Sequence, residues 1–125
     1  MDDTLFNIEI MQLMIEVNFP NLICESATSG LNSIEKVNKR ISHGREPYKL
    51  ILMDINMPPG IDGSETCRRL RKQYSRELAD TMIVAFTAIP KEQFGNPYEK
   101  KFDAMLSKPC SLVDLKEILT KADLI

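Results

Sequence analysis

The sequence has few of the features that mark a secreted, membrane-bound or nucleic-acid-binding chain. Its three cysteines stand far apart with no CxxC spacing, which argues against a disulfide framework and is typical of reduced thiols. No apolar run approaches the length of a membrane span, and the acidic start MDDTLFNIEI lacks the basic residues of a signal peptide. A net charge of −2 gives no electrostatic reason to bind nucleic acid or an anionic membrane. We therefore expect a soluble cytoplasmic domain that binds neither.

The chain also has little histidine, and its sequence contains no repeats or low-complexity segments. Its one histidine, His43, has no metal-ligand or nucleophile spacing around it, so we expect it to lie exposed at a helix end without a catalytic role. Repeats and linkers are absent from the sequence, and 125 residues suit one domain with a single sizeable core. We therefore predict that residues 1–125 form one domain.

Helical and strand patterns alternate along the sequence. Apolar residues at helical spacing predict helices, and short unbroken apolar runs bounded by turn residues predict strands buried on both faces. The predicted helices are Leu5–Val17, a second one through Ile34, Val37 and Ile41 to about His43, about Ser64–Tyr74, and one from about Leu112; the predicted strands are Leu22–Cys24, Leu50–Met53, Met82–Phe86 and Ala104–Ser107. This alternation predicts an α/β fold, in which helices cover both faces of a parallel sheet.

The first predicted helix carries two apolar ridges. One contains Met11 and Ile15, and the other contains Ile10, Leu13 and Val17. Because the two ridges together cover much of the circumference, we expect this helix to be heavily buried.

The central apolar run, Leu50–Met53, leads directly into Asp54 and then into a loop with two prolines and two glycines. An acidic side chain at the end of a buried strand lies where open α/β sheets place their ligands. The same residue can also serve only to cap the loop that follows it. The stretch alone does not separate these two readings.

Three predicted strands end in polar side chains, Asp54, Thr87 and Lys108. The carboxyl ends of parallel strands lie at one edge of a sheet, so we expect these residues to gather there. Asp2 and Asp3 would join them if a strand preceded the first helix. Carboxylates can hold Mg²⁺, an ammonium and a hydroxyl can bind phosphoryl oxygens, and Asp54 can act as the nucleophile that accepts the phosphoryl group.

Each of these side chains has a simpler reading when it is taken alone. Lys108 can be an ordinary surface lysine, and Thr87 can be a hydroxyl that ends a strand. Their joint occurrence at the ends of successive strands favours a phosphoryl-transfer site, because such chemistry needs mainly positioning and charge neutralisation.

The sequence resembles the receiver domains of response regulators, the phosphoacceptor modules of two-component signalling. Five motifs carry the resemblance in the expected order across nearly the whole chain: Asp2-Asp3, Asp54-Ile55-Asn56-Met57-Pro58, Asp62-Gly63, Thr87-Ala88 and Ser107-Lys108-Pro109. DINMP together with SKP is most similar to the receivers of hybrid histidine kinases and phosphorelays.

The resemblance implies a role for each matching residue. Asp54 would accept phosphate from a phosphohistidine on a histidine kinase or histidine phosphotransfer protein. Asp3, Asp54 and the backbone carbonyl of Asn56 would bind Mg²⁺, with Asp2 acting through water. Thr87 and Lys108 would contact the phosphoryl oxygens, and the small Ala88 would leave room for the group. The domain would catalyse only its own phosphotransfer and dephosphorylation, so it would not be an enzyme in the ordinary sense.

The sequence departs from the family's pattern at its start. The resemblance implies a flavodoxin-like, doubly wound parallel sheet of spatial order 2-1-3-4-5, whose central first strand precedes the acidic pair. Only Met1 precedes Asp2 here, so we expect a single receiver domain, residues 1–125, that lacks this strand through N-terminal truncation.

Two alternatives stay open beside the phosphoacceptor reading. The first is a pseudo-receiver that cannot be phosphorylated and acts only as a protein-interaction module. The second is an aspartate-nucleophile phosphatase, which the sequence disfavours because Asn56 stands where that family has an acid two residues beyond its nucleophile. The sequence does not indicate an oligomeric state.

Overall fold

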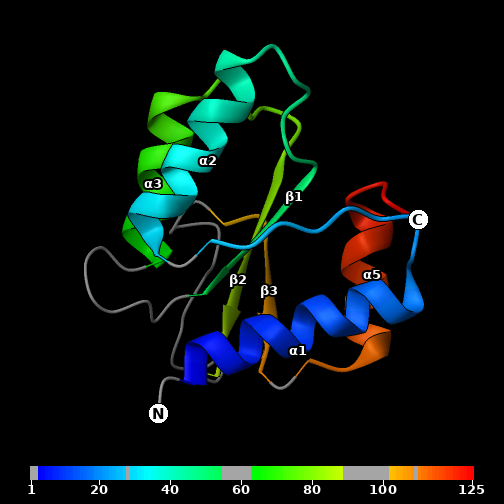
Figure 1. Ribbon diagram of the computed structural model, residues 1–125. Coiled ribbons are helices and arrows are strands. Elements are labelled where there is room, and N and C mark those ends of the chain that lie inside the picture. The colour runs from blue at the N-terminus through cyan, green and yellow to red at the C-terminus, as the bar shows by residue number, and fades with distance from the viewer. Residues whose placement is uncertain (1–2, 28, 55–62, 89–101, 109) are drawn as a thin grey trace.

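The computed structural model describes residues 3–27, 29–54, 63–88, 102–108 and 110–125, and for residues 3–8 the backbone alone. Helices and strands alternate through most of this part of the chain (Figure 1). The helices are α1 (Asp3–Asn18), α2 (Gly30–Ser42), α3 (Gly63–Gln73) and α5 (Leu112–Lys121), and the strands are β1 (Leu50–Asp54), β2 (Met82–Thr87) and β3 (Ala104–Ser107). None of the helices in these ranges combines the length and hydropathy needed to cross a bilayer.

The described strands form one parallel sheet in the order β1-β2-β3. Leu50 pairs with Met82 at the start of β1, and Asp54 pairs with Phe86 at its end. On the other side of β2, Thr87 pairs with Ser107, the last residue of β3. The three strands therefore end close together at the carboxyl edge, and the predicted α/β fold with a parallel sheet is confirmed.

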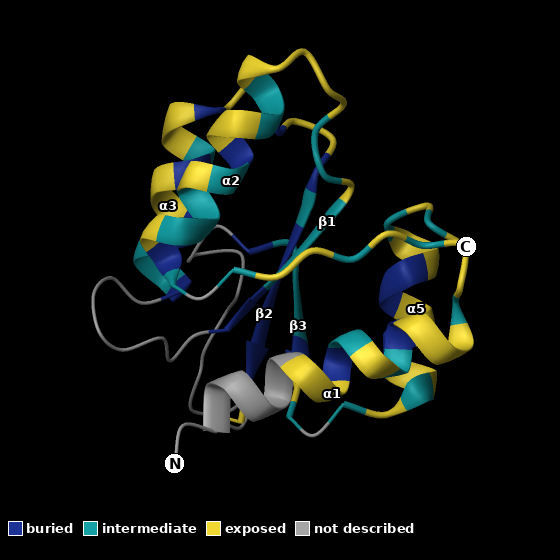
Figure 2. Cartoon of the chain, viewed as in Figure 1, coloured by how far each residue is buried: buried dark blue, intermediate teal, exposed yellow. Residues whose placement is uncertain are grey.

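Helices cover both faces of the sheet, and each face has its own core. Alternation along β2 turns Ile83 and Ala85 to the core with α2 and α3, and it turns Val84 and Phe86 to the core with α1 and α5. All four are buried (Figure 2). This burial on both faces explains why β2 reads as an unbroken apolar run.

Local sequence signals fix the ends of two helices. Ser29 precedes α2 and its hydroxyl oxygen accepts a hydrogen bond from the N–H of Asn32 at 3.0 Å. Ser111 caps α5 in the same way, through the N–H of Asp114 at 3.1 Å. Helix α2 ends at Ser42 with His43 as its C-cap; His43 is exposed as expected, and Gly44 follows with a φ of +70°.

Helix α1 is buried along one ridge only, so the expectation that it is heavily buried is wrong. Met11 and Ile15 are buried against the sheet, whereas Ile10, Leu13 and Val17 are exposed. A helix on one face of a sheet buries one stripe only, and hydrophobicity alone does not say which of two apolar ridges faces inward.

The predicted strand at Leu22–Cys24 is wrong, because the structure assigns no strand to residues 22–26. A strand needs a neighbour with which to form its ladder of hydrogen bonds. Within the described residues β1 is an end strand of the sheet, and its ladder is with β2. The segment therefore has strand-like composition without a strand beside it.

The basic residues of α3 are only partly exposed to solvent. Arg68, Arg69 and Lys72 are exposed, but the Arg71 guanidinium donates to the carbonyls of Leu78 and Thr81 at 2.7 and 2.8 Å and pairs with the Asp103 carboxylate. Asp103 also accepts a hydrogen bond from the N–H of Ile83 at 2.8 Å. Arg71 thus ties the end of α3 to the beginnings of β2 and β3.

Candidate functional site

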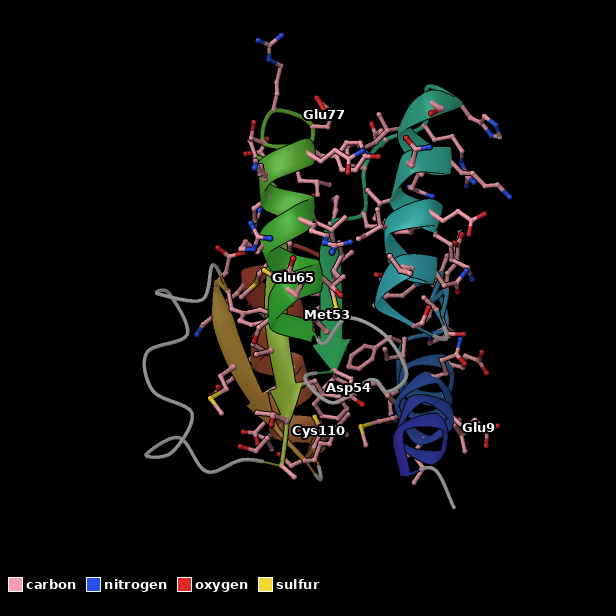
Figure 3. All side chains as sticks on the ribbon, turned by 90° about the vertical axis from the view of Figure 1, so that its left-hand side faces the viewer. Glu9, Met53, Asp54, Glu65, Glu77 and Cys110 are labelled. Carbon is pink, nitrogen blue, oxygen red and sulfur yellow. The ribbon has the colours of Figure 1, made fainter. Side chains whose placement is uncertain are left out.

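The carboxyl edge of the sheet brings Asp54 and Lys108 into contact, as the sequence predicts. The Lys108 Nζ lies 2.8 Å from the Asp54 Oδ2, although the two residues are 54 positions apart in the chain. Asp54 is 7% exposed and the Lys108 side chain 13% exposed. Figure 3 shows Asp54 at the tip of β1, next to Met53. The edge therefore holds a carboxylate and an ammonium in direct contact and largely out of water.

The sheet itself positions both members of this pair. Asp54 is the last residue of β1 and pairs in register with Phe86. The N–H of Lys108 donates to the carbonyl of Thr87 at 2.9 Å, one residue beyond the last pair of β2 and β3. Because this bond extends the ladder, the backbone of Lys108 is fixed relative to β2, and its side chain reaches across Phe86 to Asp54.

Phe86 is a member of the site that the sequence reading missed. The Lys108 Nζ lies 5.2 Å from the centroid of the Phe86 ring, a distance at which a cation is attracted to the ring face. Phe86 is 8% exposed, so it shields the ion pair from water on one side. Its position one residue before Thr87 was the available signal, but a pattern of apolar residues does not show which ring lies beneath a lysine.

Thr87 lies at the same edge and is 2% exposed. Its contribution to Lys108 is the backbone carbonyl described above. Contact of its hydroxyl with a phosphoryl oxygen stays a prediction, and so does the role of Ala88, which is exposed immediately after β2.

The predicted magnesium ligands are only partly within the described residues. Asp54 is described in full, and Asp3 is the first residue of α1, described by its backbone. Asp2 and Asn56 lie outside the described residues. In the described ranges, no group of three or more His, Cys, Asp or Glu side chains is arranged to hold a metal. The carboxylate of Asp54 is nevertheless the kind of hard oxygen donor that Mg²⁺ prefers.

Comparison with known proteins finds a family model that covers most of the chain. The family model described as "Response regulator receiver domain" matches residues 1–120. Hybrid signal transduction histidine kinase L from Dictyostelium discoideum is 32% identical over 124 residues, which is 96% of this chain and 7% of that protein. The chain therefore spans a small part of this curated relative.

Solved structures of response regulators have the same fold as this chain. A two-component response regulator from Legionella pneumophila has a TM-score of 0.77 at 22% identity, over 99% of this chain and 93% of that one. A two component response regulator from Cytophaga hutchinsonii has a TM-score of 0.70 at 26% identity, over 97% and 90% of the two chains.

Proposed function

We propose that Asp54 is a phosphoacceptor, from the premise that this chain belongs to the family of response regulator receiver domains. The observation that carries the proposal is the contact between the Asp54 carboxylate and the Lys108 ammonium at 2.8 Å, at the carboxyl edge of the parallel sheet. A buried carboxylate held beside a fixed cation suits a nucleophile whose product carries more negative charge.

The proposed reaction is transfer of a phosphoryl group from a phosphohistidine to Asp54. An Asp54 carboxylate oxygen attacks phosphorus, a P–O bond forms, and the P–N bond to the histidine breaks; the electron pair of that bond stays on the imidazole nitrogen. Lys108 is placed to balance the added charge, and Thr87 is proposed to donate a hydrogen bond to a phosphoryl oxygen. Because Lys108 is already fixed over Phe86, little reorganisation is needed as the charge develops.

The proposed cofactor is Mg²⁺. Asp54, Asp3 and the backbone carbonyl of Asn56 would hold it, with Asp2 acting through water, and this set of carboxylate and carbonyl oxygens suits the ion. Bound there, the ion would neutralise charge on the phosphoryl oxygens. Asp54 would thus serve both as ligand and as acceptor.

The proposed partners are a histidine kinase or a histidine phosphotransfer protein as donor. The curated relative is a hybrid histidine kinase, which supports a place in a phosphorelay. The domain would catalyse only its own phosphorylation and dephosphorylation, and it would pass the signal on through protein contacts.

The first prediction tests Asp54 directly. Purified chain incubated with Mg²⁺ and acetyl phosphate should gain the mass of one phosphoryl group, which hydroxylamine should remove because an acyl phosphate is labile to it. Asp54→Asn should abolish the gain, since an amide is not a nucleophile of this kind. The intact masses are measured on samples shown to be folded by far-UV circular dichroism.

The matched control is Asp80→Asn, which changes an exposed carboxylate and should leave phosphorylation unchanged. Incorporation into the Asp54→Asn protein would contradict the assignment. A folded wild-type chain that takes no phosphoryl group from acetyl phosphate and shows no response to beryllofluoride with Mg²⁺ would instead favour the pseudo-receiver function.

A further inference from the structure

The side chain of Lys108 crosses the middle strand of the described sheet to reach Asp54. These strands lie in the order β1-β2-β3, so Asp54 at the end of β1 and Lys108 just after β3 lie on opposite sides of β2. Two strand spacings amount to about 10 Å. The Lys108 Nζ nevertheless lies 2.8 Å from the Asp54 Oδ2. The lysine side chain therefore extends over β2, and the β2 residue beneath it helps to determine its path.

Strand alternation places Phe86 beneath that path. Leu52 of β1, Phe86 of β2 and Leu106 of β3 all pack in the core with α1 and α5. Asp54 follows Leu52 by two residues, so alternation turns it to the same face. Lys108 follows Leu106 by two residues and continues the ladder, so it faces the same way. The Lys108 Nζ accordingly lies over the Phe86 ring, 5.2 Å from its centroid.

The ring of Phe86 is itself held in the core. It is 8% exposed and belongs to the buried cluster that contains Leu115 and Ile118 of α5. A side chain packed in this way keeps one position. Its attraction for an ammonium comes from the electron density of the ring face and needs no charge on the ring. Phe86 is therefore a fixed contact for Lys108 that does not depend on the charge of Asp54.

The two contacts of the ammonium respond differently to the proposed reaction. When the Asp54 carboxylate becomes an acyl phosphate it loses its charge, and negative charge is placed on the phosphoryl oxygens instead. The contact at Asp54 Oδ2 is weakened at that step, whereas the ring face of Phe86 is unchanged. A lysine held by a carboxylate alone would then regain the rotamer freedom of its long stem.

We propose that Phe86 is a positioning residue, a second anchor that keeps the Lys108 ammonium at the carboxyl edge independently of the Asp54 carboxylate. The proposal rests on the proposed function for the role of Lys108 at the phosphoryl group. During phosphorylation the ammonium then moves only from Asp54 Oδ2 to a phosphoryl oxygen, while it stays over the ring. Phe86 acts on the reaction through Lys108.

The second prediction separates the two anchors in the unphosphorylated chain. Protons held over the face of an aromatic ring resonate upfield, so the Hε protons of Lys108 report its position over Phe86. Asp54→Asn replaces the carboxylate by a neutral amide, and these protons should nevertheless keep most of their upfield shift. In the double variant Asp54→Asn, Phe86→Leu, the order parameter of the Lys108 Cε should fall to that of the exposed Lys116. NMR chemical shifts and relaxation of the metal-free chain provide the readouts.

The matched control is Phe102→Leu. Phe102 is 1% exposed in the core with α2 and α3, on the other face of the sheet. Its replacement removes packing of the same kind as Phe86→Leu, but it should leave the Lys108 order parameter unchanged, both with Asp54 in place and in the Asp54→Asn background. Weaker packing in general would disorder Lys108 in both variants, whereas loss of the ring contact disorders it in Phe86→Leu alone.

A kinetic readout connects the anchor to the proposed reaction. With Mg²⁺ and acetyl phosphate, Phe86→Leu should take up the phosphoryl group about twofold to thirtyfold more slowly than the wild-type chain, the range that a contact between a cation and a ring can contribute. Phe86→Tyr keeps the ring and should react at nearly the wild-type rate, and so should Phe102→Leu. Intact masses give the rates on samples shown to be folded.

Several results would overturn the proposal. The Hε protons of Lys108 can lose their upfield shift in Asp54→Asn, or the lysine can stay ordered in the double variant. Phe102→Leu can disorder Lys108 as much as Phe86→Leu does. If Asp54→Asn does not fold, the order parameter and the phosphorylation rate are compared between Phe86→Leu and Phe102→Leu alone, and equal values overturn the proposal. A wild-type chain that takes up no phosphoryl group contradicts the proposed function, and the NMR comparison still decides whether Phe86 anchors Lys108.

Discussion

Asp54 and Lys108 form an ion pair with little access to water. This burial determines how much stability the fold loses when either residue is replaced. The pair is assembled by the sheet register and by Phe86, which lies beneath the ammonium. Removing one member of a buried pair leaves the other charge without its partner, and that penalty exceeds the net contribution of the pair itself. Lys108, which would balance the charge of the phosphoryl group in the proposed reaction, therefore also stabilises the fold before phosphorylation.

The third prediction concerns this dependence. Lys108→Met keeps an apolar stem over Phe86 but removes the cation, and we expect the free energy of unfolding at pH 7 to fall by about 3 kcal/mol. Urea denaturation followed by circular dichroism measures the change. The control, Lys116→Met, removes an exposed lysine of α5 and should stay within about 0.5 kcal/mol of wild type. Equal stability of the two variants would show that the ion pair is not a stabilising contact.

At the scale of single elements, α1 shows which side of an apolar helix has a structural role. Met11 and Ile15 contact the core that contains Val84, Phe86 and Leu115, while Leu13 is 60% exposed. Truncating a buried side chain leaves a cavity, whereas truncating an exposed one removes few contacts. The two ridges of α1 should therefore differ sharply in their effect on stability.

The fourth prediction compares these ridges. Ile15→Ala should lower the free energy of unfolding by about 2–5 kcal/mol, and Leu13→Ala should change it by less than about 0.5 kcal/mol. Both variants carry the same kind of change on the same helix, so the difference reports burial. The measurement is the urea midpoint at constant m-value. If Leu13→Ala lowered the free energy of unfolding as much as Ile15→Ala, the exposed ridge of α1 would be buried by another surface in solution.

The elements were predictable from sequence where a local pattern determines them. The periodic spacing of Cys67, Leu70 and Tyr74 predicts a buried helix face; Cys67 and Leu70 lie on α3, Tyr74 follows its last residue, and all three are buried. Prediction failed where the outcome depends on a neighbour. Leu22–Cys24 has the composition of a strand, but its ladder depends on a strand that residues 3–27 and 29–54 do not supply.

The candidate site divides in the same way. Asp54 and Lys108 were predictable because parallel topology alone brings strand ends together. The roles of Phe86 and of the Arg71–Asp103 pair were not, because they depend on the paths of side chains across the sheet. The other predicted ligands and contacts remain predictions, among them Asp2, Asp3, Asn56 and the Thr87 hydroxyl.

At the scale of the whole molecule, two cores share one strand. Consecutive residues of β2 belong to opposite cores, with Ile83 packed among α2 and α3 and Val84 among α1 and α5. A change in one core therefore reaches the other through the backbone of a single strand. We expect the described sheet and its helices to unfold as one cooperative unit, as small single domains usually do.

The fifth prediction uses Cys67 as a reporter of this cooperativity. Cys67 is 0% exposed in the core with α2 and α3, and burial raises the pKa of its thiol from 9.0 to about 11. At pH 8 the folded protein therefore holds this thiol protonated and inaccessible, and alkylation has to await unfolding. In a background with Cys24→Ser and Cys110→Ser, the alkylation rate then measures the opening of that core alone.

Two matched substitutions separate global opening from local opening. Ile83→Val lies in the core of Cys67, and Ile118→Val lies in the opposite core; each should lower the free energy of unfolding by about 0.5–1.5 kcal/mol. If the cores open together, both should accelerate alkylation of Cys67 by the factor that matches their loss of stability, between about twofold and about tenfold. An Ile118→Val protein that is less stable in urea but labels at the wild-type rate would instead show that the two faces of the sheet open independently.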